Sequence, residues 1–145
     1  MLRRRALLAL VATAFLLAPL SALAQEEVKV TVHVIHASKK KGKVDERLAQ
    51  LEKELTDFGF KSYILLRAQE MKLPLATSGQ VELPGDRRLV VTPLSRDEDG
   101  KLKLQVVIEG VVDTTINIKD GASILFGGLK HEGGRLMVAI TQSAI

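Results

Sequence analysis

Residues 28–35 read Val28-Lys29-Val30-Thr31-Val32-His33-Val34-Ile35, and this stretch decides the fold class. Valine occupies the four even positions, whereas lysine, threonine and histidine occupy the odd positions between them. An apolar, β-branched residue at every second position is typical of a strand that buries one face. The sequence therefore predicts a half-buried β-strand here, with a sheet or helix packed against its valine face.

Similar alternation continues after residue 59, in short runs that turn signals separate. Pro84-Gly85-Asp86, Asp99-Gly100 and Asp120-Gly121 mark three of these turns, and turns about every 8 to 12 residues are typical of sandwiches and barrels. The run 60–66 is apolar enough for a central strand, and Pro93 indicates a sheet edge or a strand end. We expect about eight further strands, at residues 60–66, 71–75, 81–83, 89–94, 102–108, 112–118, 124–126 and 136–140.

Residues 44–58 change to a helical period. Apolar side chains recur every three or four residues, at Val44, Leu48, Leu51, Leu55 and Phe58. This spacing places them on one stripe of an amphipathic helix. Asp45 and Glu46 stand in the first turn, where the helix dipole favours acids, and Gly59 is suited to end the helix.

These elements predict an α+β fold that is mostly antiparallel β-sheet, either a sandwich or a partly open barrel. We expect about nine short strands and one amphipathic helix near the mature N-terminus. The first strand, the helix and the second strand could form one parallel crossover. Residues 25–145 are expected to form a single β-rich domain.

The first 24 residues have the pattern of a secretory signal peptide. Residues 1–5 are basic, residues 6–17 are apolar, and Ala22-Leu23-Ala24 supplies the small residues that a signal peptidase reads. The apolar run is short for a spanning helix, which needs about 20 residues; an uncleaved anchor is the alternative. We expect a periplasmic or secreted protein that begins at Gln25 and has no transmembrane segment after cleavage.

Composition excludes several function classes. The chain has no cysteine, so disulfides, thiol catalysis and cysteine metal sites are impossible. It has no tryptophan and few other aromatic residues, which disfavours stacking platforms for bases or sugars. Three of the 21 Lys and Arg residues lie in the leader and all 17 Asp and Glu residues lie outside it, so the mature chain carries a net charge of about +1. That balance does not indicate a nucleic-acid partner.

The densest charge lies in Ala37-Ser38-Lys39-Lys40-Lys41-Gly42-Lys43-Val44, between the first strand and the helix. A phosphate-binding loop would need glycine at Ala37 and serine or threonine at Val44, so we expect no nucleotide cofactor. The four lysines are the candidate contacts for an anionic surface or an acidic partner, with a plain solvated loop as the alternative. These candidate residues are Lys39, Lys40, Lys41 and Lys43.

Other residue patterns favour no catalytic or metal site. His33 and His36 differ in strand parity and should face opposite sides, while His131 is expected alone in a glycine-rich turn. Asp97-Glu98-Asp99-Gly100 lacks the later ligands of a calcium loop and indicates a hairpin turn. No Gly-x-Ser-x-Gly motif or paired carboxylates stand out, so we assign no catalytic, cofactor or metal residue.

One segment resembles a known family. Residues 120–129 read Asp120-Gly121-Ala122-Ser123-Ile124-Leu125-Phe126-Gly127-Gly128-Leu129. An Asp-Gly turn, a short apolar strand and Gly-Gly-Leu in this order resemble a hairpin element of the secretin domain, which builds outer-membrane secretion pores. The resemblance implies a module built from similar hairpins, with Gly127-Gly128 between two strands.

Taken together, the sequence predicts a non-catalytic exported protein of the bacterial envelope that binds or assembles with another envelope component. The physical basis is a polar strand face and many short strands, whose edges can take a partner strand. The alternative is a small periplasmic hydrolase or ligand-binding enzyme with a site assembled from scattered residues. A pocket in which Asp, His or Arg converge would favour that alternative.

Overall fold

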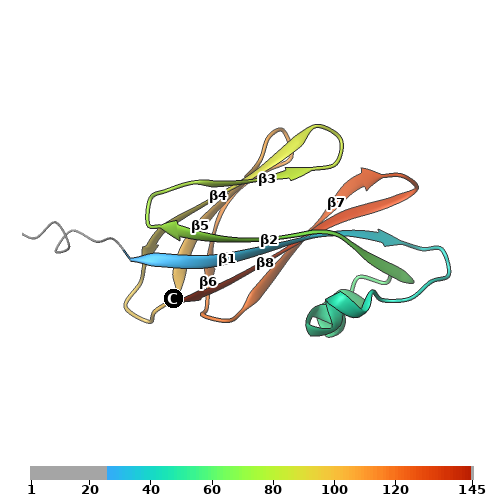
Figure 1. Ribbon diagram of the computed structural model, residues 1–145, viewed down its shortest axis with the longest axis horizontal. Helices are drawn as coiled ribbons and strands as arrows, with labels where there is room; N and C mark the ends of the chain where they lie inside the picture. Colours follow the sequence, from blue (N-terminus) through green and yellow to red (C-terminus); the bar gives the residue numbers. More distant parts are fainter. Residues whose placement is uncertain (1–25, 145) are drawn as a thin grey trace, which may run out of the picture.

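The computed structural model of the protein describes residues 26–144, so the expected leader lies outside the described part (Figure 1). Eight β-strands and one short helical segment make up these residues. Their bounds are β1 Glu27–Ser38, η2 Glu46–Leu51 (a 3-10 helix), α1 Glu52–Thr56, β2 Ser62–Pro74, β3 Gly79–Leu83, β4 Arg87–Arg96, β5 Leu102–Ile108, β6 Val112–Ile118, β7 Ser123–His131 and β8 Gly134–Ala144.

The strands form two four-stranded antiparallel sheets. The first sheet has the order β2-β1-β8-β7 and the second has the order β3-β4-β5-β6. Both sheets are open, so the mostly antiparallel prediction is confirmed and the molecule is not a closed barrel. The four strands of the second sheet follow one another along the chain, whereas the first sheet joins the two ends of the described chain through the β1–β8 pair (Figure 1).

The main core lies between the two sheets. Val28, Val30, Val32 and Val34 of β1 are fully buried, as the alternation predicted. Across from the first sheet, the inward side chains of β5 are buried in the same cluster: Leu102, Leu104, Val106 and Ile108. Opposed apolar faces of this kind are what hold two packed sheets together.

A second core covers the other face of the first sheet at one end. Ile35 and Ala37 of β1 point away from the second sheet and are fully buried beneath the helical segment. The helical side chains in this core are Leu48, Leu51 and Leu55, the middle of the predicted stripe. The Tyr63 hydroxyl donates to the Leu55 carbonyl, which ties the end of the segment to β2.

The predicted single helix over residues 44–58 is wrong in its extent. A 3-10 helix runs into a five-residue α-helix, and the segment ends before Gly59, whose φ of 78° reverses the chain. Val44 precedes the segment and forms a parallel bridge to Tyr63, while Phe58 lies beyond it and is 46% exposed. The predicted stripe was therefore too long at both ends.

The strand count differs from the predicted nine because residues 60–66 and 71–75 belong to one strand. β2 crosses the polar residues 67–70 without a break, and β1 is the only strand of the described residues that pairs with it. An edge strand tolerates such polar residues, so the predicted central position was wrong. The β1–β2 pair is also antiparallel, which corrects the expected parallel crossover.

Two irregularities explain the other differences. Pro93 lies in β4, an inner strand, next to a register shift between Pro93 and Ser95 and beyond the last β3 pair at Val91. It thus stands where proline's missing donor is tolerated. Gly127 and Gly128 do not separate strands but lie inside β7, where the register shifts by one residue.

In residues 26–144, no helix is both long and apolar enough to cross a bilayer.

The second core generates a stability prediction. Leu51→Ala and Leu55→Ala each remove a buried side chain and should lower the free energy of unfolding by about 2–5 kcal/mol. Gln50→Ala and Lys53→Ala change exposed neighbours of the same segment and should cost less than about 0.5 kcal/mol. Chemical denaturation of the four variants measures this, and similar losses in both pairs would show that the segment does not pack as described.

Candidate functional site

The four candidate lysines lie in the loop between β1 and η2, at one end of the molecule (Figure 1). Lys39, Lys40, Lys41 and Lys43 are all exposed. Gly42, between them, packs so closely against β2 that a Cβ there would lie 2.7 Å from the Cβ of Ser62. The structure therefore groups the four lysines on one exposed loop.

Beyond the lysines the chain runs along the outer edge of β2. The Asp45 N–H donates to the Tyr63 carbonyl at 2.8 Å, and the Tyr63 N–H donates to the Lys43 carbonyl at 3.2 Å. A hollow of ≈ 430 Å³ lies here, beside exposed Ile64. The segment thus covers the first part of the β2 edge with backbone.

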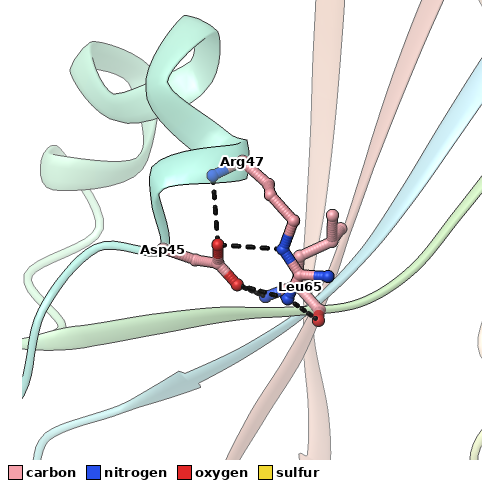
Figure 2. A network of polar contacts seen from close by, with 3 residues as sticks. All are labelled: Asp45, Arg47 and Leu65. Atoms are coloured by element: carbon pink, nitrogen blue, oxygen red, sulfur yellow. Dashed lines mark hydrogen bonds and ion pairs between the residues drawn. The ribbon is translucent and has the colours of Figure 1, made fainter.

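Asp45 and Arg47 continue this cover with side chains (Figure 2). The Leu65 N–H donates to Asp45 Oδ2 at 3.1 Å, and Arg47 Nη2 donates to the Leu65 carbonyl at 3.2 Å. The two side chains also bind each other, since Arg47 Nη2 donates to Asp45 Oδ2 at 2.7 Å and Arg47 Nε donates to Oδ1 at 3.1 Å. Together they satisfy the backbone of Leu65 much as a neighbouring strand would.

The electrostatics of this pair follow from those contacts. Side-chain hydrogen bonds from Arg47, followed by the Arg47 backbone N–H, hold the pKa of Asp45 well below its ordinary value. The same partnership raises the pKa of Arg47. Asp45 also caps the 3-10 helix, because its carboxylate accepts the Arg47 N–H. The sequence placed Asp45 at the helix start but gave no signal for its contact with Leu65.

The remaining edges of the sheets differ in how they are covered. β3 has only five residues, and its Gln80 carbonyl accepts a hydrogen bond from Gln69 Nε2 of β2 at 3.1 Å. β7 carries the register shift at Gly128, and Arg135 Nη1 donates to the Gly128 carbonyl at 2.9 Å. Short edges, bulges and charged side chains are devices that stop edge strands from pairing with other chains.

β6 lacks those devices along most of its length. Its seven residues pair with β5 in unbroken register, from Val112 opposite Ile108 to Ile118 opposite Leu102. They include neither proline nor lysine, and Asp113 is the single charged residue. A side chain of the first sheet reaches the strand at its end, where Gln142 Nε2 donates to the Ile118 carbonyl at 3.1 Å. Within residues 26–144, no strand pairs with the outer side of β6.

A second hollow, of about 360 Å³, lies between the helical segment and the outer face of the first sheet. Six polar side chains from four parts of the chain line it: His33, Arg47, Gln50, Glu54, Ser123 and Thr141. The Ser123 and Thr141 hydroxyls bind each other at 2.6 Å. Burial lowers the pKa of His33, so its imidazole is neutral near pH 7. Sequence analysis missed this convergence, because no local pattern joins these residues.

The expectation that His131 lies alone was wrong. Its backbone carbonyl lies 3.0 Å from Nε2 of His36, and the two rings meet edge to face with centroids 5.6 Å apart. Glu132 lies beside them, 3.8 Å from His131 Nε2. In the described residues, no three His, Asp or Glu side chains converge as metal ligands would. The cluster joins the end of β7 to β1 and indicates a structural contact.

The Asp45–Arg47 pair generates a pH-dependent prediction. The pKa of Asp45 is lower in the folded protein than in the unfolded chain. Asp45 therefore stabilises the fold above about pH 4, and this stabilisation is lost as the pH falls below that value. Asp45→Asn keeps a capping side chain but removes the charge. Thermal melts should therefore show a less stable variant at pH 7 and a shrinking difference toward pH 2.

Asp57→Asn, at an exposed position after the helical segment, is the matched control and should show no comparable change at pH 7. A constant difference between wild type and Asp45→Asn over the whole pH range would contradict the prediction.

Comparisons with protein-family models, curated proteins and solved structures found no match for this chain.

Proposed function

We propose that this protein is a non-catalytic, exported module of the bacterial envelope that binds a partner by accepting its β-strand at the β6 edge. The observation that carries the proposal is the contrast between the regular β6 edge and the other three edges, of which β3 is short, β7 is bulged and β2 is covered in its first part. A bare strand presents a row of backbone donors and acceptors, which another extended chain satisfies by strand addition. The resemblance of residues 120–129 to a secretin hairpin supports the same class of function, an assembly module.

Apolar side chains are also partly exposed on the side of the molecule that contains β6. Val112 and Ile116 of β6, together with Ile124 and Phe126 of β7, pack against the main core but are only partly buried. On the opposite side Met71 of β2 is likewise partly buried but packs closely on β3, since a Cβ on Gly79 would lie 2.6 Å from its sulfur. A strand added beside β6 would cover apolar area as well as backbone groups.

A second candidate function is the binding of a small polar ligand, and the His33 hollow favours it. Neutral His33 and the Glu54 carboxylate face a space of about 360 Å³, which is of the size of ligand pockets. Hydrolysis is disfavoured, because the Ser123 hydroxyl hydrogen-bonds to the Thr141 hydroxyl rather than to a base that could activate it.

The lysine loop supports a further, electrostatic contact with an anionic surface. Four exposed lysines within five residues attract acidic lipids or an acidic partner, at about 1 kcal/mol per lysine near a membrane. We expect this contact to orient the protein rather than to select a partner, because simple charge attraction carries little specificity.

Strand addition predicts where a partner touches the protein. A photoreactive residue placed at Thr115 or Asn117 of β6 should give crosslinked adducts in living cells, because both side chains are exposed on the free edge strand. The same residue at Gln80 of the short β3 edge is the control and should give none. Adducts from Gln80 as strong as those from Thr115 would contradict a specific role for β6.

The electrostatic contact predicts salt-sensitive binding to vesicles that contain anionic lipid. Changing the four loop lysines to glutamine should remove most of this binding, and raising the salt until the Debye length falls below about 8 Å should do the same. The control variant changes four exposed lysines elsewhere to glutamine, at Lys72, Lys103, Lys119 and Lys130. Equal loss in both variants would reduce the effect to net charge.

A further inference from the structure

We propose that the strand received by β6 is the β6 strand of a second copy of this chain, so that the two second sheets join into one continuous sheet. The two β6 strands would pair in antiparallel orientation about a two-fold axis at Thr115. This inference rests on the proposed function, because it names the occupant of the same edge. Three features of β6 favour a self-pair: its register, its charge pattern and its half-buried inner face.

The register follows from the length of the strand. Thr115 is the central residue of Val112–Ile118, so an antiparallel pair centred there aligns each whole strand with the other. Val112 then lies opposite Ile118 of the second copy at both ends. Because no bulge interrupts β6, the ladder can run from Val112 up to Ile118, whose carbonyl already accepts a hydrogen bond from Gln142 Nε2. Such two-fold pairing is self-complementary, as closed symmetric dimers require.

The charge pattern favours that register over one centred at Asp113. Asp113, Thr115 and Asn117 are the exposed side chains, and they share one face of the strand. With the axis at Thr115, the Asp113 carboxylate lies opposite the Asn117 amide of the second copy, which can donate a hydrogen bond to it. An axis at Asp113 would instead bring two carboxylates together, and like charges directly opposite destabilise a strand pair. The mature net charge of about +1 adds little long-range repulsion.

The self-pair would bury more of the inner face of β6. Val112, Thr114 and Ile116 point toward the main core but stay half-buried, because nothing continues the second sheet beyond them. In the self-pair Thr114 lies opposite Ile116 of the second copy, and Val112 opposite Ile118. β-Branched side chains pair well across antiparallel strands. The other edges are less regular, since β3 has only five residues, β7 is bulged at Gly128, and Asp45 with Arg47 covers β2 at Leu65.

The test measures the molecular mass of the protein in solution, after purification from cells that express the full chain. Sedimentation over a range of concentrations should show two chains per particle for the wild type. Thr115→Lys and Thr115→Glu each place like charges across the axis and should raise the dimer dissociation constant about fivefold or more. An equimolar mixture of these two variants should restore the dimer, because lysine then faces glutamate. Gln80→Lys, on the short β3 edge, should leave the wild-type mass unchanged.

The outcomes separate this inference from the function on which it rests. A wild-type dimer that Thr115→Lys leaves intact, or a mixture that stays monomeric, would overturn the self-pair at Thr115. A monomeric wild type whose Thr115 crosslinks to a different protein would overturn it too, while strand addition at β6 would stand. A monomeric wild type without any adduct from Thr115 would refute both.

Discussion

The burial of β1 on both of its faces is the constraint on which the structure depends. Its valines pack against the second sheet along the first two thirds of the strand, while Ile35 and Ala37 lie under the helical segment near its end. A strand buried in this way needs a partner on each edge and a layer on each side. β2 and β8 supply the edges, the second sheet supplies one layer, and the helical segment supplies the other. These requirements place every other described element except β7, which extends the first sheet beyond β8.

Local patterns were sufficient for most of the fold. The alternation in β1, β5 and β6 and the turn signals at Asp99-Gly100 and Asp120-Gly121 identify strands, because side-chain direction in a strand has a period of two. Leu48, Leu51 and Leu55 identify the buried face of the helical segment for the same kind of reason. The continuous β2 could not be predicted, since its polar middle is compatible with a strand only at a sheet edge. Sheet order is set by long-range pairing, which no local window contains.

The candidate site likewise combines features that local sequence predicts with contacts that depend on distant parts of the chain. The lysines are exposed, as a charged loop suggests, and Asp45 stands at the helix start, where acids are favoured. Its contact with Leu65 spans 20 residues and depends on how β2 lies beside the loop. Whether β6 is an edge depends on the order of all four strands in its sheet. The hollow beside His33 likewise draws on four segments that meet only after the first sheet has formed and the helical segment has packed on it.

The pairing of β1 with β8 has a consequence for how the chain reaches its folded state. The second sheet is made of neighbours in sequence, so each of its hairpins can form as soon as its own residues are available. The first sheet must wait for a strand that follows roughly a hundred residues later, and closing so long a loop slows folding. Until β8 arrives, one edge of β1 stays unpaired. A newly made chain therefore carries an unpaired strand edge until β8 is complete, and such edges are prone to aggregate.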